Sequence, residues 1–165
     1  METKELLILG SRQCAQLVLP MLDDLSTAPH VSPVSGGGNH AHWLVGHILH
    51  SDGNFRASMD GTPNPLASLA ALFGAGTTPE PEGRGYPPYP ELLAELKSRN
   101  EATLAWISGL SEQDLGRATQ VVPPGFESFF GTWRQVLLMR IFHWMTHRGQ
   151  LADCRRAAGR APLLA

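Results

Sequence analysis

The sequence contains few cysteines and no long apolar run, and each absence argues against a class of protein. The 165 residues include only Cys14 and Cys154, which form neither a CxxC pair nor a zinc-finger spacing. A disulfide framework is therefore not expected, and we interpret both residues as buried, reduced thiols. No apolar stretch reaches the roughly 18–20 residues that a membrane-spanning helix needs.

The sequence also lacks a strong excess of charge of either sign. The formal net charge is −2, so no long-range field would attract DNA or an anionic membrane, and we expect neither as a partner. The first residues, METKELLILG, show no signal-peptide cleavage site. The apolar content of 42% and charged content of 17% are typical of a globular chain. We therefore expect one soluble, cytoplasmic domain over residues 1–165.

Apolar residues recur at helical spacing in four long segments, which predict an all-α fold, specifically a four-helix bundle. A three-helix domain with a mobile tail is the alternative. In the first segment, Ile8 and Leu19 widen the apolar stripe beyond one face, which suggests a homodimer contact. Asn39 is the expected N-cap of the second segment, and the TWRQ run at Thr132 predicts a capping box for the fourth. The segments span roughly residues 3–25, 40–59, 91–110 and 132–158.

A proline- and glycine-rich crossover, residues 60–90, separates the second and third segments. Its only helical run is PLASLAALFG. Long connections of this kind usually pack over one end of a bundle and often shape a binding site.

The fourth segment contains HWMTHRGQL, in which His143 and His147 are four residues apart. That spacing leaves the two side chains about 40° apart on a helix and one turn from each other, so they can bind one ion. The H-E-x-x-H helices of zinc proteases use the same spacing. Here Trp144 stands where those proteases carry their glutamate base, which argues against a protease. The pair alone can also arise by chance in a chain with seven histidines.

The second segment adds four more histidines, of which His47 lies mid-helix among apolar residues. Burying an imidazole without a partner costs about 1–3 kcal/mol, and a metal ion would supply the partner. His50 is about 60° from His47, so spacing leaves it open as a ligand or as a supporting residue. His40 and His42 lie in the first turn, where we expect them to be exposed or capping.

Two further features follow the histidine pair in the fourth segment. Gln150 is seven residues after His143 and returns to nearly the same face, where it either hydrogen-bonds a ligand imidazole or bound water, or is an ordinary polar residue. Gly149 is expected to permit close helix approach. We interpret the arginines of this segment as a solvated face. They are Arg134, Arg140, Arg148, Arg155, Arg156 and Arg160.

The two histidine segments, HWLVGHILHSDGNF and GTWRQVLLMRIFHWMTHRGQLADCRRAAG, resemble those of the DinB/YfiT-like metal-binding bundles. This is the damage-inducible family, not the DNA polymerase that shares its name. The resemblance implies a four-helix bundle, often dimeric, in which His47, His143 and His147 bind one divalent ion, zinc or nickel. It also implies metal-dependent S-transferases or isomerases that use low-molecular-weight thiols such as mycothiol or bacillithiol.

Three functions remain open at this point. The first is a metal-dependent S-transferase with the crossover shaping the electrophile pocket. His50 and Asp52 are its acid–base candidates if they face the open metal position, and no catalytic residue is assigned. The second is a non-catalytic metal-binding or stress-response protein. The third is a metal-dependent hydrolase, which needs a carboxylate or polar network near the ion.

Overall fold

Four long helices make up most of the chain in a computed structural model that describes residues 2–35 and 37–163. The described residues contain no β-strand, only two isolated bridges, so the all-α prediction is confirmed. The long helices are α1 (Thr3–Asp24), α2 (Ala41–Asp60), α4 (Tyr89–Ser108) and α7 (Trp133–Ala157). The short helices are α3 (Ala70–Phe73), α5 (Glu112–Leu115) and α6 (Glu127–Phe130), with 3₁₀ turns at Leu25–Thr27 and Ala67–Leu69.

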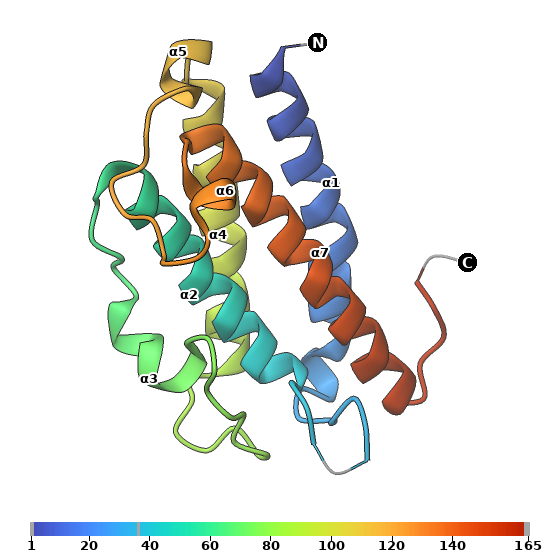
Figure 1. Cartoon of the computed structure of the whole chain (residues 1–165). Helices are drawn as coiled ribbons and strands as arrows, with labels where there is room; N and C mark the ends of the chain where they lie inside the picture. The colour runs from blue at the N-terminus through green and yellow to red at the C-terminus, as the bar shows by residue number, and fades with distance from the viewer. Residues whose placement is uncertain (1, 36, 164–165) are drawn as a thin grey trace.

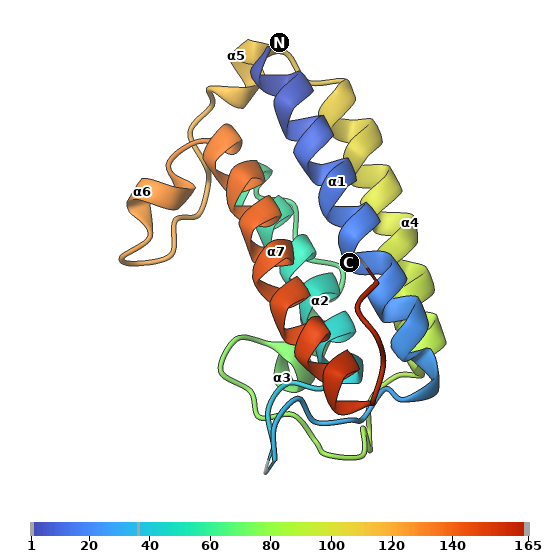
Figure 2. The same ribbon diagram turned by 90° about the vertical axis from the view of Figure 1, so that its right-hand side faces the viewer.

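The four long helices lie side by side, and we call them the bundle (Figures 1 and 2). Helices α4 and α7 each pack against both α1 and α2. Apolar side chains fill the space between them, including the fully buried Leu22, Leu44, Leu96 and Trp144. Cys14 and Cys154 are both buried and free, as the sequence predicts. Among the described residues, none of the helices is both long and apolar enough to cross a membrane.

Two helix starts differ from the prediction. His40, not Asn39, is the N-cap of α2, because its Nδ1 accepts a hydrogen bond from the Trp43 amide at 3.2 Å. Thr132 precedes α7 in extended conformation but forms no side-chain cap. Its hydroxyl donates instead to Gln135 Oε1 at 2.9 Å. The predicted capping box is therefore wrong, because the two side chains bond to each other.

The crossover between α2 and α4 packs its one helical run against α2. The predicted short helix appears as the Ala67–Leu69 turn followed by α3, and Phe73 at its end is fully buried. Gly46 of α2 makes this packing possible, because a Cβ at that position would lie 2.6 Å from the Phe73 ring. The prediction that Gly149 permits close helix approach is wrong, since in the described part of the chain no heavy atom outside its own stretch of helix lies within 4 Å of a Cβ there.

Candidate metal centre

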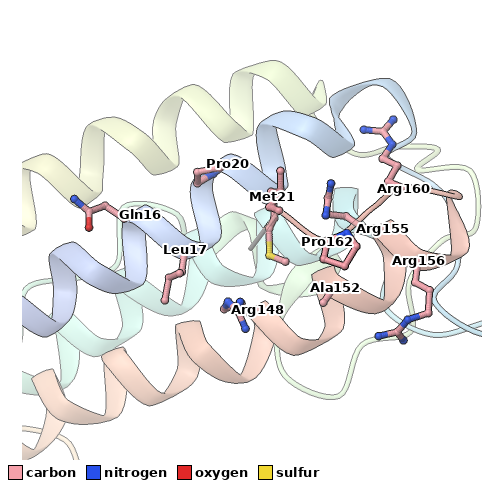
Figure 3. Close-up of a pocket in the computed structure, with 11 residues that line it drawn as sticks. Gln16, Leu17, Pro20, Met21, Arg148, Ala152, Arg155, Arg156, Arg160 and Pro162 are labelled. Carbon is pink, nitrogen blue, oxygen red and sulfur yellow. The ribbon is translucent and has the colours of Figure 1, made fainter. Parts of the chain in front are cut away.

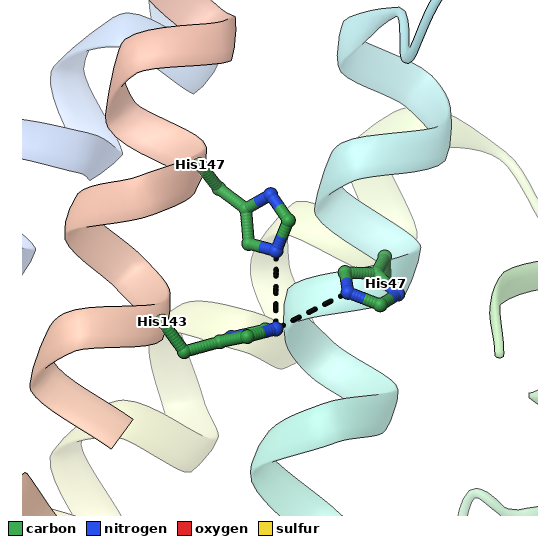
Figure 4. Close-up of side chains that lie close together, drawn as sticks. All are labelled: His47, His143 and His147. Carbon is green, nitrogen blue, oxygen red and sulfur yellow. Dashed lines mark hydrogen bonds between the residues drawn. The ribbon is translucent and has the colours of Figure 1, made fainter. Parts of the chain in front are cut away.

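Three histidines from two helices point their rings at one another across the gap between α2 and α7 (Figure 4). His143 and His147 stand on successive turns of α7, and His47 faces them from α2. The Nε2 atom of His143 lies 3.2 Å from Nε2 of His47 and 3.0 Å from Nε2 of His147. We call these residues the histidine triad.

The outer ring nitrogens fix which nitrogen carries hydrogen in two of the rings. His47 Nδ1 lies 2.7 Å from the Phe73 carbonyl oxygen, and His147 Nδ1 lies 2.7 Å from Gln150 Oε1. Both partners are oxygen acceptors, so each Nδ1 must donate a hydrogen. In a neutral imidazole the other nitrogen then carries only a lone pair. The inward-facing Nε2 atoms of His47 and His147 are therefore both acceptors.

His143 cannot satisfy both of these acceptors. Its Nε2 carries at most one hydrogen, so at least one of the two short Nε2–Nε2 contacts has no proton between its nitrogens. Its Nδ1 is buried and finds no hydrogen-bond partner within the described part of the chain. A cation between the three Nε2 atoms would satisfy all three lone pairs at once.

The distances suit a metal ion. Imidazole nitrogens bind zinc at about 2.0–2.1 Å, so two ligands at the tetrahedral angle lie about 3.3–3.4 Å apart. The measured separations of 3.0 and 3.2 Å are close to this value, and the ligand atoms of the triad all lie within 4.8 Å of one another. His47, His143 and His147 could therefore hold one ion.

Burial keeps the triad in the neutral form that binds metals. Burial, reinforced by the neighbouring imidazoles, lowers the pKa of His143 to about 3. It lowers the pKa of His147 to about 4, and the hydrogen bond to Gln150 opposes this only in part. The pKa of His47 is lowered by burial as well. All three rings are thus uncharged near neutral pH, when their lone pairs are free to bind a cation.

Two aromatic side chains contact the triad, and one of them also lines a pocket. Trp43 stacks on His47 with ring centres 4.5 Å apart, and the Phe55 ring meets His143 edge-on at 5.4 Å. Phe55 also lines a neighbouring cavity of about 460 Å³, in which no lining side chain is ionisable. Its wall consists of Ser51, Asn54, Phe55, Ala57, Ser58, Ala75, Val121, Pro123 and Phe130.

Asp52, an acid–base candidate from the sequence, is engaged in a buried network. Its Oδ2 accepts hydrogen bonds from Arg140 Nε at 3.0 Å and Nη2 at 2.6 Å, and its Oδ1 accepts one from Trp144 Nε1 at 2.9 Å. Arg140 Nη2 also donates to Asn100 Oδ1 at 3.0 Å. The carboxylate therefore ties α2 to α7, and through Arg140 to α4. Arg140 is 2% exposed and Arg155 is 5% exposed, so the interpretation of the α7 arginines as a solvated face is wrong for these two residues.

The two remaining site predictions lie differently with respect to the triad. Gln150 contacts it directly through His147 Nδ1. His50 is buried, and its Nδ1 lies 3.5 Å from Asn54 Nδ2. His40 and His42 were expected to be exposed or capping. His40 is buried but caps α2, as one of these alternatives predicts, whereas His42 is buried and is not the N-cap.

The sequence analysis missed the Phe73 carbonyl, because a backbone oxygen leaves no residue-type signal. Gly46 was the available hint, since a glycine beside His47 marks a place where another segment approaches α2 closely. The sequence analysis expected the crossover, residues 60–90, to shape the pocket, but the crossover supplies only Ala75 to the pocket wall. The connector between α4 and α7 supplies more of that wall, namely Val121, Pro123 and Phe130.

Comparison with known proteins agrees with this geometry. A family model described as the DinB superfamily matches residues 12–151, which include all three histidines of the triad. The curated proteins contain no match to the chain. The match extends over well more than half of the sequence and confirms the resemblance that the two histidine segments carry. The chain belongs to the DinB superfamily.

Proposed function

We propose that the chain binds one divalent metal ion, zinc or nickel, through Nε2 of His47, His143 and His147, and uses it as an S-transferase acting with a low-molecular-weight thiol. One observation carries the metal proposal: two lone-pair nitrogens face a third ring that can supply only one hydrogen. Three neutral protein ligands are typical of catalytic sites, which keep a position open, whereas structural sites usually have four.

When bound, such an ion supplies Lewis acidity and lowers the pKa of a thiol that reaches the open position. The chain's residues then have positioning roles. Phe73 and Gln150 hold two imidazoles in their metal-binding orientation, and Trp43 and Phe55 limit water around them.

The pocket beside Phe55 supports an uncharged, apolar electrophile, because none of its lining side chains is ionisable. In the transfer, the thiolate sulfur forms a bond to an electrophilic carbon of that molecule. The bond to the leaving group breaks with its electron pair, and the thiol proton passes to water. We assign no acid or base from the chain, since both Asp52 oxygens already accept hydrogen bonds.

The first experiment measures metal content and thiol chemistry in the purified protein. Elemental analysis is expected to find one zinc or nickel per chain. Turnover of an aryl halide is then followed with mycothiol, bacillithiol or no thiol, with metal-loaded and chelator-stripped protein. Turnover that needs both metal and thiol supports the proposal, and equal rates with and without metal would discard the S-transferase.

The two alternatives give different results in the same assay. A non-catalytic metal-binding or stress-response protein would contain stoichiometric metal and turn over nothing. A hydrolase would release product from ester substrates with metal and without thiol. The structure favours the hydrolase less, because the nearby carboxylate of Asp52 is already paired with Arg140.

We also propose a homodimer, because large apolar side chains remain exposed on two adjacent helices. Leu6 and Leu9 of α1 and Leu138 and Phe142 of α7 are between 43% and 56% exposed. A second copy that covers them would remove this apolar surface from water. Sedimentation is expected to show a dimer that Leu6→Glu weakens, and a monomer at all concentrations would contradict it.

A further inference from the structure

A second cavity lies on another side of α7, away from the triad. It measures about 330 Å³ and is bounded by α1, α7 and the segment that follows α7 (Figure 3). No residue of the triad, and no residue that hydrogen-bonds the triad, lines it. Its size lies at the lower end of the range for small-molecule sites.

Four arginines line this cavity, and three of them have acidic partners. Arg155 and Arg160 pair with Asp24 at 2.7 and 2.9 Å. Arg156 pairs with Asp153 at 2.6 Å and extends to the outer side of α7 (Figure 3).

Arg148 is the exception among the four. Within the described part of the chain it has no ion pair, and its buried Nε has no hydrogen-bond partner. Its guanidinium lies between α1 and α7, beside Leu17 (Figure 3). A buried donor without an acceptor costs free energy, more so for a charged group, and a guanidinium is always protonated in proteins. Arg148 is thus the one lining arginine without a carboxylate beside it within the described residues, whereas Arg155 and Arg160 share the single negative charge of Asp24.

The rest of the lining is mainly apolar. Leu17, Pro20 and Met21 contribute from α1, Ala152 from α7, and Leu163 from the final segment. A ligand that fits both features has a negatively charged group for the Arg148 guanidinium and an apolar body. An inorganic anion would leave the apolar wall uncovered, and a neutral apolar molecule would leave Arg148 unpaired.

We propose that this cavity binds a small amphipathic monoanion, with its carboxylate on Arg148 and its apolar body against Leu17 and Met21. The planar guanidinium matches a carboxylate through two parallel hydrogen bonds. The inference is independent of the metal proposal, because the two sites share no residue. It assigns to Arg148, the arginine of the HRGQ motif, a role in ligand binding.

The test is calorimetric titration of the full-length protein with octanoate, acetate and 1-octanol. Octanoate is expected to bind with a stoichiometry of one, at least about tenfold more tightly than either of the others, because only it has both charge and apolar body. Acetate binding as tightly as octanoate would show an adventitious ion only. Octanol binding as tightly would show that Arg148 recognises no anion. Each result overturns the proposal, as does no binding of octanoate.

Two variants locate the site. Arg148→Gln is expected to weaken octanoate binding by about tenfold or more, as the loss of a charge-assisted hydrogen bond predicts. Arg156→Gln removes a lining arginine that faces outward and should leave the affinity unchanged. The melting temperature and metal content of both variants should match the parent.

A third variant is used if Arg148→Gln lowers the melting temperature. Arg148→Lys keeps the charge and should retain more octanoate affinity than the glutamine variant. Equal octanoate affinity in Arg148→Gln and the parent overturns the assignment.

Discussion

The chain contains two clusters of three buried or half-buried histidines, and they differ in how their ring nitrogens are paired. The first is the triad between α2 and α7, where two outer nitrogens donate hydrogen bonds and the inner nitrogens face one another. We call the second the loop cluster. It consists of His30, from the connection that precedes α2, and of His40 and His42 at the start of α2.

In the loop cluster, each of the hydrogen bonds described next joins a donor nitrogen to an acceptor. His42 Nε2 donates to the Pro87 carbonyl at 2.8 Å, so its Nδ1 is free to accept from His30 Nε2, also at 2.8 Å. His40 Nε2 donates to the Glu80 carbonyl at 2.7 Å. Hydrogen bonds alone satisfy these rings, and they tie the crossover to the start of α2. Proximity of histidines therefore does not define a metal site, whereas convergence of unprotonated nitrogens points to one.

The largest expected difference between the clusters is in metal content. His143→Ala removes the central ligand, and metal affinity should fall by more than the roughly 10–100-fold that loss of a supporting partner costs. His42→Ala, the matched change in the loop cluster, should keep stoichiometric metal. Elemental analysis after dialysis measures both, and metal loss in the His42 variant would contradict the comparison.

A smaller effect is expected from Gln150→Ala. Without its acceptor, His147 can adopt the other tautomer or rotate, and metal affinity should fall by about 10–100-fold. Gln13→Ala, an exposed glutamine of α1, serves as the control. Competition with a chelating dye measures the affinities. Equal values for both variants would show that Gln150 is an ordinary polar residue.

The third expected effect is on the stability of the metal-free protein. His42→Ala should lower the free energy of unfolding by about 2 kcal/mol, because it leaves the His30 donor and the Pro87 carbonyl without their partner. His143→Leu should lower it little or not at all, because it removes a facing lone pair and a buried unpartnered Nδ1. Urea unfolding in chelator measures both changes. A larger loss in the His143 variant would mean that the triad is satisfied without metal.

The smallest expected effect is on the pH dependence of stability. Burial lowers the pKa of His42, and the titratable rings around it are His30, His40, Tyr86 and Tyr89. The stabilisation from its neutral form is complete above the unfolded pKa of about 6.5 and is lost as the pH falls below that value. Between pH 7 and 5.5, the parent should therefore lose more stability than His42→Gln, by at most about 1.4 kcal/mol per pH unit. Parallel unfolding curves would contradict this.

Sequence periodicity predicted the four long helices well, because each carries a continuous apolar stripe that only a bundle can bury. It was weaker at helix ends. At Asn39 and Thr132 the rules offered a good capping residue, but His40 caps α2 instead, and the Thr132 hydroxyl donates to Gln135 Oε1 rather than capping α7. The short α5 and α6 were not predicted, since runs of four residues show no periodicity.

The sequence by itself determined which histidines have helical spacing and which helices carry them, because side-chain direction along a helix follows from residue number. Only the tertiary structure decided how the other polar groups are used. It placed Asp52 on Arg140 and Gln150 on His147, and among the described residues it left Arg148 without an acidic partner. These outcomes depend on contacts between segments far apart in the chain, and no local pattern specifies which donor meets which acceptor.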